Sequence, residues 1–232
     1  MTSVKALVTK HPVLTYFVRG LHVLGSRLRK CRVATHWYAV ALLAAPMVAA
    51  PLTLTLSRFS SEFLPALVVA DDRIAVLLLG LGVGITAGLF EELGWTGFAI
   101  PRLKLRHGVL ATGLIVGLLW SAWHVLVVVW GIGERAGTMP LALFVVVDGL
   151  AGLPAFRVLM VLVYDRTESL FLAMLMHVSL TATTLILTPQ TTGIRLVAYG
   201  LAFAMAIWLI IASVSAADRR HLARRPLRRR AA

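Results

Sequence analysis

The sequence predicts an all-α fold, a polytopic transmembrane bundle of about six helices, and two observations carry this prediction. Hydrophobic residues make up 59% of the 232-residue chain, charged residues only 14%, and the mean hydropathy is +0.87. Water-soluble domains of this length rarely show such values. Several windows of more than about 18 residues carry few or no charges, which is the length an α-helix needs to cross about 30 Å of hydrocarbon.

Hydropathy places the spans one after another along the chain, each ended by a short polar, basic or glycine- and proline-containing connection. They are expected at about 37–56, 74–98, 108–130, 141–164, 169–187 and 194–215. Neither an internal repeat nor a low-complexity linker separates a second domain. We therefore expect one helical bundle over residues 37–216.

Basic segments flank this bundle. Residues 1–36 contain only a short apolar run, "VLTYFV", which is too short for a signal-peptide core, so a membrane-surface segment is expected. Residues 217–232 form an arginine-rich tail that we interpret as a lipid-facing cytoplasmic anchor. A single cysteine, Cys31, excludes an internal disulfide.

The basic residues also predict an orientation. The formal net charge is +13, and 18 of the 23 lysines and arginines lie in the two flanks and in the connections after the second and fourth spans. By the positive-inside rule, these regions and both termini are cytoplasmic, which an even number of spans allows. We expect a multi-pass protein of the cell membrane that contacts membrane lipid and binds no nucleic acid, with no oligomeric state assigned.

Glu91 and Glu92 stand near the end of the second span, in "GLFEELGWTGFAIPRL" (88–103), after a long run without charge. An ionisable group in hydrocarbon costs several kcal/mol, so it needs a partner, a cavity or a function. Because successive helical positions lie about 100° apart, one acid is expected to react while the other holds its neighbours. The alternative, two interfacial acids, fits less well because the apolar residues that follow place them about 12 Å inside the boundary.

Two histidines complete a candidate site. His124 in the third span shares a helical face with Trp120, and His177 in the fifth shares one with Thr181. Each histidine alone fits a structural role equally well. With the glutamates they supply a carboxylate base, imidazoles and a hydroxyl, the parts needed to activate water. On straight helices, His124 lies deeper than the acids, about 24 Å from the cytoplasmic start of its span.

Zinc is an alternative use of the same groups. Glu91, His124 and His177 form a possible ligand set, since one glutamate and two histidines leave an open position for water in catalytic zinc sites. The short-spaced zinc signature H-E-x-x-H is absent from the sequence. The residues alone leave both a metal-free and a zinc site open.

Other features of the spans indicate structural roles. Asp148 and Arg157 in the fourth span lie about 180° apart around a helix, so we expect each to pair with another helix or to reach the interface. Small-residue faces occur on two spans, and we expect them to pack the second span on the third and draw the acids toward His124. These faces are formed by Gly80, Gly84 and Gly88 and by Gly113 and Gly117.

Three motifs in order, "EELGWTGFAIPRL", "GLLWSAWHV" and "YDRTESLFLAMLMHVSLTATT", resemble the CPBP family of intramembrane proteases, which includes CAAX prenyl endopeptidases and the Abi proteins. The resemblance covers about residues 74–190. It implies peptide-bond hydrolysis in the membrane, with Glu91 as general base and Glu92 as its support. It further implies that His124 polarises the water and that His177 stabilises the oxyanion.

The chain departs from the family pattern at three places. Thr96 stands where the first motif usually has arginine, and Thr181 stands where the third motif usually has asparagine. Thr181 has less reach than asparagine, so the oxyanion-stabilising role is weakened, and one such donor is worth about 10²-fold to 10³-fold in rate. Family members commonly have eight spans, so one or two N-terminal spans are expected to be missing or shortened.

The sequence therefore predicts an intramembrane endopeptidase, of glutamic or metallo type, that cleaves a peptide or protein substrate near the cytoplasmic leaflet. One alternative is a catalytically degenerate relative that acts as a membrane scaffold or immunity protein, which the two threonines favour. Another is a proton-relay transporter, since intramembrane glutamates and histidines also mark ion paths. The predicted polar residues cluster in three motifs, whereas a transporter would distribute them along several helices or place them on paired broken helices.

Overall fold

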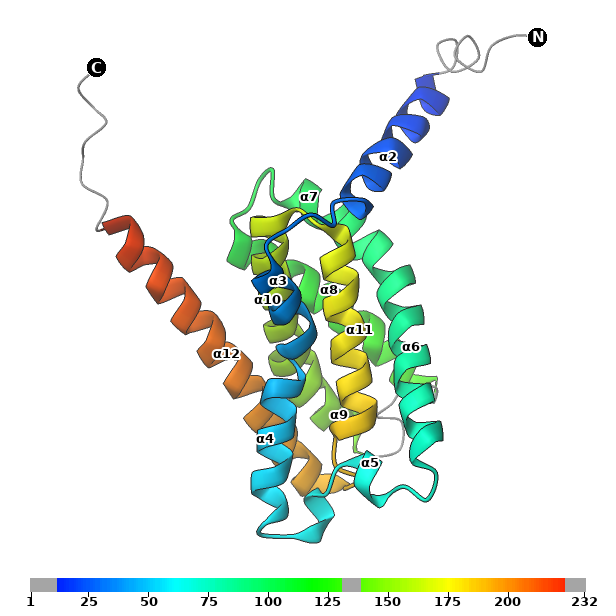
Figure 1. The fold of residues 1–232 in the computed structure, drawn as a ribbon, viewed down its shortest axis with the longest axis vertical. Coiled ribbons are helices and arrows are strands. Elements are labelled where there is room, and N and C mark those ends of the chain that lie inside the picture. The colour runs from blue at the N-terminus through cyan, green and yellow to red at the C-terminus, as the bar shows by residue number, and fades with distance from the viewer. Residues whose placement is uncertain (1–11, 131–138, 224–232) are drawn as a thin grey trace.

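The computed structural model describes residues 12–130 and 139–223, and this part of the chain is helical with no strand, as the sequence predicted (Figure 1). The elements are α2 (Pro12–Leu28), α3 (Thr35–Leu43), α4 (Pro46–Ser57), the 3₁₀ turn η1 (Ser61–Phe63), α5 (Ala66–Val69), α6 (Arg73–Gly94), the π-helix η2 (Trp95–Ala99), α7 (Ile100–Leu103), α8 (Val109–Val129), α9 (Leu141–Phe144), the π-helix η3 (Val145–Gly152), α10 (Leu153–Thr167), α11 (Leu170–Leu187) and α12 (Gly193–Ala223).

In the described part of the chain, six helical segments are long and apolar enough to cross a membrane, which confirms the expected multi-pass bundle. They are Thr35–Ser57, Arg73–Leu103, Val109–Val129, Leu141–Thr167, Leu170–Leu187 and Gly193–Ala217. The second ends five residues beyond the expected boundary, because η2 joins α6 to α7 without a break. Large apolar side chains such as Ile74, Leu78 and Phe90 are exposed on α6, as expected for a surface that faces lipid.

Local signals in the sequence set several helix ends. The side chain of Asp72 accepts a hydrogen bond from the Ala75 amide at 2.9 Å and caps the start of α6. Ser169 caps α11 in the same way through the Leu172 amide at 3.2 Å. Helix α10 ends at Thr167, and the next residue, Glu168, has a φ of 50° that turns the chain sharply toward α11.

The glycine face of α6 packs on α11, so the expectation that it would pack on the third span is wrong. A Cβ atom at Gly84 would lie 2.9 Å from the Val178 carbonyl oxygen, and one at Gly88 would lie 2.9 Å from the Met174 carbonyl oxygen. Only a residue without a side chain lets the two backbones approach this closely. The fifth span, which carries His177, is therefore the helix that lies directly against the acids.

The glycine face of α8 instead packs on α10. A Cβ atom at Gly113 would lie 2.7 Å from the Val158 Cα atom, and one at Gly117 would lie 2.7 Å from the Pro154 Cα atom. The bundle thus contains two tightly packed helix pairs, α6 with α11 and α8 with α10. The glycine spacing predicted close packing correctly but did not identify the partner helices.

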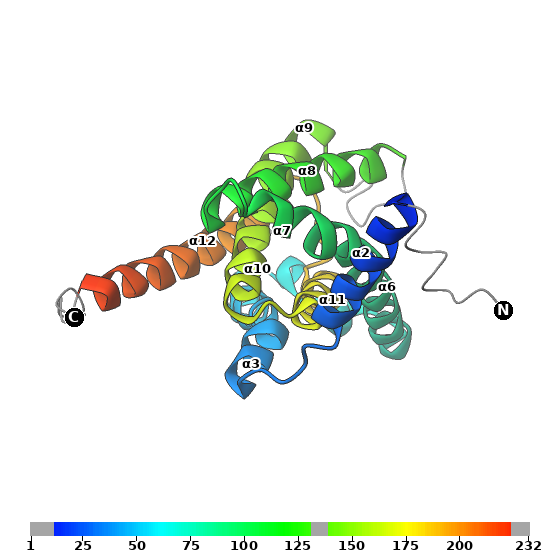
Figure 2. The same cartoon turned by 90° about the horizontal axis from the view of Figure 1, so that it is seen from above.

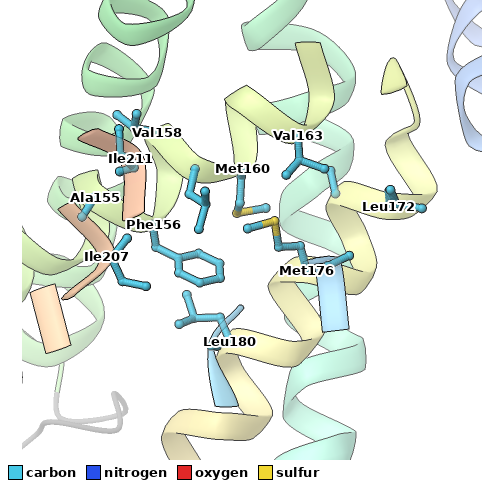
Figure 3. Packing of buried hydrophobic residues seen from close by; sticks show 14 of the residues in the cluster. Ala155, Phe156, Val158, Met160, Val163, Leu172, Met176, Leu180, Ile207 and Ile211 are labelled. Atoms are coloured by element: carbon cyan, nitrogen blue, oxygen red, sulfur yellow. The ribbon is translucent and has the colours of Figure 1, made fainter. Parts of the chain in front are cut away.

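An apolar core joins the two pairs. Phe156 and Met160 of α10 lie toward Met176 and Leu180 of α11, as Figure 3 shows, and all four side chains are buried. Side chains of α3 and α12 close this core, including Ala41 and Ile207. The long unbranched methionines fill the irregular space between helices of different tilt.

Helix α2 projects from one end of the bundle, and the C-terminal half of α12 diverges toward the same end (Figures 1 and 2). Arg27 of α2 donates a hydrogen bond to the Gly97 carbonyl of η2 at 3.3 Å. Lys30 lies 2.7 Å from Glu168, and its hydrogen bond and positive charge lower the pKa of that exposed carboxyl. Residues 1–11 and 224–232 lie outside the described part, so the surface location of 1–36 and the tail at 217–232 stay predictions.

Adding a methyl group to the α6 glycine face should separate the two helices. We expect Gly84→Ala to lower the free energy of unfolding by about 1–3 kcal/mol, because the new Cβ atom meets a backbone oxygen that cannot move aside. Gly82→Ala is the matched control, since a Cβ atom there meets nothing within 4 Å. Thermal unfolding in detergent measures both variants, and equal melting temperatures would contradict the assigned packing.

Candidate active site

The acidic pair lies just before the point where α6 passes into the π-helical turn η2. A π-helical turn inserts one extra residue into a helix and frequently occurs at functional sites. Here it contains Thr96, which is fully buried and donates a hydrogen bond to Oε2 of Glu92. Because the turn continues into α7, the acids lie eleven and twelve residues before Leu103, about 18 Å from the end of the span.

Glu92 is completely buried, and three polar side chains bind its carboxylate. Nη1 of Arg157 donates to both carboxylate oxygens, at 2.8 Å to Oε1 and 3.0 Å to Oε2. Nδ1 of His177 lies 2.7 Å from Oε1, and Thr96 contacts Oε2. A carboxylate without water is tolerable only when a counter-charge and hydrogen bonds replace its solvation, and these three side chains supply both.

Arg157 is the site residue that the sequence interpretation missed. It extends from α10, is fully buried, and places its guanidinium carbon 4.1 Å from the centre of the Trp120 ring. The general expectation that it pairs with another helix holds, but its position in the fourth span did not indicate Glu92 as the partner. Its charge inside a hydrocarbon span was the only signal that could have identified it.

Glu91 points to a different neighbour from Glu92. It accepts a hydrogen bond from Nε1 of Trp120 at 2.7 Å and is only partly buried. Trp120 begins the last three turns of α8 and lies eleven residues after Val109, at a depth similar to that of the acids. Straight helices place His124 deeper in the membrane than Glu91. Trp120 lies between these two depths and contacts both residues.

The two histidines have defined hydrogen-bond partners on one ring nitrogen each. Nδ1 of His124 lies 3.0 Å from the Trp120 carbonyl oxygen, which can only accept, so Nδ1 carries the proton and Nε2 is left as an acceptor. Nδ1 of His177 donates to the Glu92 carboxylate. Both rings meet Trp120 edge to face, with centroids 5.0 Å and 5.2 Å away.

The site residues fall into two groups, those that line a cavity of about 290 Å³ and those that do not. Glu91, His124 and His177 line it, whereas Glu92 and Arg157 lie behind them. The structure thus gives the adjacent glutamates different positions: one borders a space that a substrate could occupy, and the other is locked in the protein.

The cavity continues from the histidines along the half of the bundle that lies away from α2. Beyond His177 it follows three hydroxyl side chains, those of Thr181 and Thr184 on α11 and of Thr188, which directly follows this helix. The eleven residues from His177 to Thr188 correspond to about 16 Å of helix. Thr181, one of the predicted supporting residues, therefore lines the same cavity one turn beyond His177, and Asp148 of η3 also borders it.

The side chains do not fit a metal ion well. Among residues 12–130 and 139–223, no three histidine, cysteine, aspartate or glutamate side chains are grouped as metal ligands are. The buried Arg157 guanidinium, 2.8 Å from Glu92, adds a fixed positive charge beside the acidic pair. A cation at this place opposes the binding of a second cation.

The region of the chain that resembles known proteins is also the region that contains these site residues. Residues 73–183 match the family described as type II CAAX prenyl endopeptidase, Rce1-like. The curated protein "CAAX prenyl protease 2" of Methanococcus maripaludis is 36% identical over 66 residues, which are 28% of this chain and 19% of that protein. This match thus spans about a fifth of the length of the relative. The family region contains both acids, both histidines and Arg157.

The two adjacent glutamates should differ in their effect on stability. We expect Glu92→Gln to cost about 3 kcal/mol of unfolding free energy, because it leaves the buried Arg157 charge without a counter-charge. Glu91→Gln makes the same chemical change one residue away but faces the cavity, so we expect a change within about 1 kcal/mol. Thermal unfolding of the two purified variants measures the difference, and equal effects would argue against the two-sided arrangement.

Proposed function

We propose that the protein hydrolyses a peptide bond inside the membrane, because residues 73–183 match the type II CAAX prenyl endopeptidase family, which lies within the CPBP group that the sequence predicted. One observation carries the proposal: Glu91, His124 and His177 line a single cavity, while the second glutamate is held behind them. A carboxylate and two imidazoles that line one cavity are the groups that water activation requires.

Glu91 is the general base of the proposed reaction. It removes a proton from a water in the cavity as the water oxygen attacks the peptide carbonyl carbon, and a tetrahedral oxyanion forms. The carbon–nitrogen bond then breaks, and the proton held by Glu91 passes to the leaving amine. The Trp120 indole fixes the orientation of this carboxylate through its 2.7 Å hydrogen bond.

The histidines take separate roles that their hydrogen bonds favour. Nε2 of His124 is an acceptor, so it orients the water by accepting one of its hydrogens. Nδ1 of His177 is held by the Glu92 carboxylate, so Nε2 is the ring nitrogen that donates to the oxyanion when the ring carries both protons. The hydroxyl of Thr181, one turn away in the same cavity, is a second donor for the oxyanion.

We propose the glutamic rather than the metallo type for this reaction. The cationic Arg157 beside the acids and the dispersed ligand set support that choice. The scissile bond is expected at the depth of Glu91, about 18 Å from the α7 end of its span, which is nearer the bilayer centre than the cytoplasmic leaflet suggested by the sequence. With both termini in the cytoplasm, the cavity extends from there toward the opposite surface.

Peptide cleavage by the purified protein in liposomes tests the proposal. Three quenched-fluorescent probes are compared, each with and without excess EDTA: a farnesylated peptide ending in a CAAX sequence, the same peptide without the lipid, and an apolar membrane-spanning peptide. We expect cleavage of at least one probe, with Glu91→Gln lowering kcat by at least about 100-fold. Glu168→Gln, which alters an exposed acid at the end of α10, is the matched control and is expected to keep full activity.

Three outcomes would overturn parts of this proposal. Cleavage by Glu91→Gln at the native rate excludes this residue as the base. Loss of activity in EDTA that zinc restores identifies a metallopeptidase instead. A folded native protein that cleaves none of the three probes supports the catalytically degenerate alternative, for which Thr181 in place of the family asparagine is the motivating feature.

A further inference from the structure

Among the described residues, Arg157 is the one buried lysine or arginine, and nothing in the proposed reaction needs it to touch substrate. We infer that Arg157 is the positioning residue of this site, because it contacts both side chains that hold the cavity-lining groups. This inference rests on the proposed function. Arg157 would hold the base, Glu91, and the oxyanion donor, His177, in fixed positions relative to each other.

The argument begins with what Arg157 touches. Nη1 binds both oxygens of Glu92, and Glu92 in turn binds Nδ1 of His177. The face of the same guanidinium lies 4.1 Å from the Trp120 ring, and this indole binds Glu91 and packs edge to face against the His124 ring. One side chain therefore fixes two holders, and the two holders fix all three groups at the cavity.

The cost of this arrangement indicates a role beyond packing. Nε and Nη2 of Arg157 are buried without a hydrogen-bond partner among the described residues, so the guanidinium is incompletely satisfied. A buried ion pair of this kind is commonly replaced by apolar side chains with no loss of stability. A bundle that needed only close packing would therefore be served as well by apolar side chains at both positions, 92 and 157.

The backbone brings Arg157 to the site by a close helix approach. A Cβ atom at Gly117 of α8 would lie 3.4 Å from the Cβ atom of Arg157 and 2.7 Å from the Cα atom of Pro154. This contact brings α10 close to α8 one turn before Trp120, so the arginine reaches across Trp120 to Glu92 on α6. The arginine thus connects the two helix pairs of the bundle.

Thr96 offers a second position from which a cation can reach the same carboxylate. It lies four residues after Glu92, is fully buried, and already contacts Oε2 through its hydroxyl. An arginine here would extend from η2, which continues α6, rather than from α10. Moving the charge from position 157 to position 96 therefore tests whether the guanidinium beside Glu92, and not the packing of α10, is what the site requires.

The activity test compares Arg157→Met, Arg157→Lys and the relocated variant Thr96→Arg with Arg157→Met. We expect Arg157→Met to lower kcat by about 100-fold with KM changed less than about threefold, since it acts through other residues and not through substrate. Arg157→Lys keeps a charge without the planar fork and should retain about a tenth of the activity. The relocated variant should exceed Arg157→Met by at least about tenfold, whereas the control Arg166→Met at the exposed end of α10 should match the native rate.

A measurement without turnover separates this inference from the proposed function. In protein with ¹⁵N-labelled histidine and tryptophan, we expect Arg157→Met to shift the His177 ring nitrogens and the Trp120 indole signal, with the relocated variant restoring the His177 shift. Assignment uses His177→Gln and Trp120→Phe. If native protein cleaves no probe, the proposed function fails, and these signals still decide the role of Arg157.

Several results would overturn the inference. Native kcat in folded Arg157→Met, or unchanged His177 and Trp120 signals, shows that the guanidinium holds neither residue. If Arg157→Met does not fold, the relocated variant decides between the two roles. A relocated variant that folds and shows the native His177 ring signals but has no activity assigns Arg157 to packing alone. A rise in KM with constant kcat would instead make it a substrate-binding residue.

Discussion

The ion pair between Glu92 and Arg157 is the interaction on which the rest of the site depends. It joins two helix pairs that glycines pack separately, α6 with α11 and α8 with α10. The carboxylate comes from the first pair and the guanidinium from the second, and both are fully buried. Because a buried charge without its partner is costly, the two pairs cannot shift relative to each other without a large energetic penalty.

The division between the two glutamates follows from this constraint. Neighbouring positions on a helix face different directions, so only one acid can meet Arg157. Glu92 takes that position and leaves Glu91 to border the cavity with His124 and His177. The chain thus obtains a fixed carboxylate and an accessible one from two adjacent residues, and the fixed one orients the histidine beside the accessible one.

Much of the fold and part of the site could be predicted from the sequence. Long apolar windows are sufficient to locate membrane helices, and the three motifs identified the residues that line the cavity, because ionisable groups in hydrocarbon are rare. The sequence shows Arg157 as a charge inside a span but does not identify Glu92 as its partner, since helical spacing indicates which residues share a face and not which helix packs there. The glycine faces illustrate the same limit: they indicated close packing, but α6 packs on α11 and not on α8. The depth of the acids was also underestimated, because the π-helical turn that continues the second span has no signal in hydropathy.

A double-mutant cycle between Glu92 and Arg157 tests the central claim most directly. The unfolding free energies of the native protein, Glu92→Gln, Arg157→Met and the variant with both changes are measured in detergent. If the pair holds the bundle as described, the double variant is more stable than the sum of the single effects predicts, by about 2 kcal/mol or more. Effects that add within about 0.5 kcal/mol would show that the two residues are not coupled and would contradict this account.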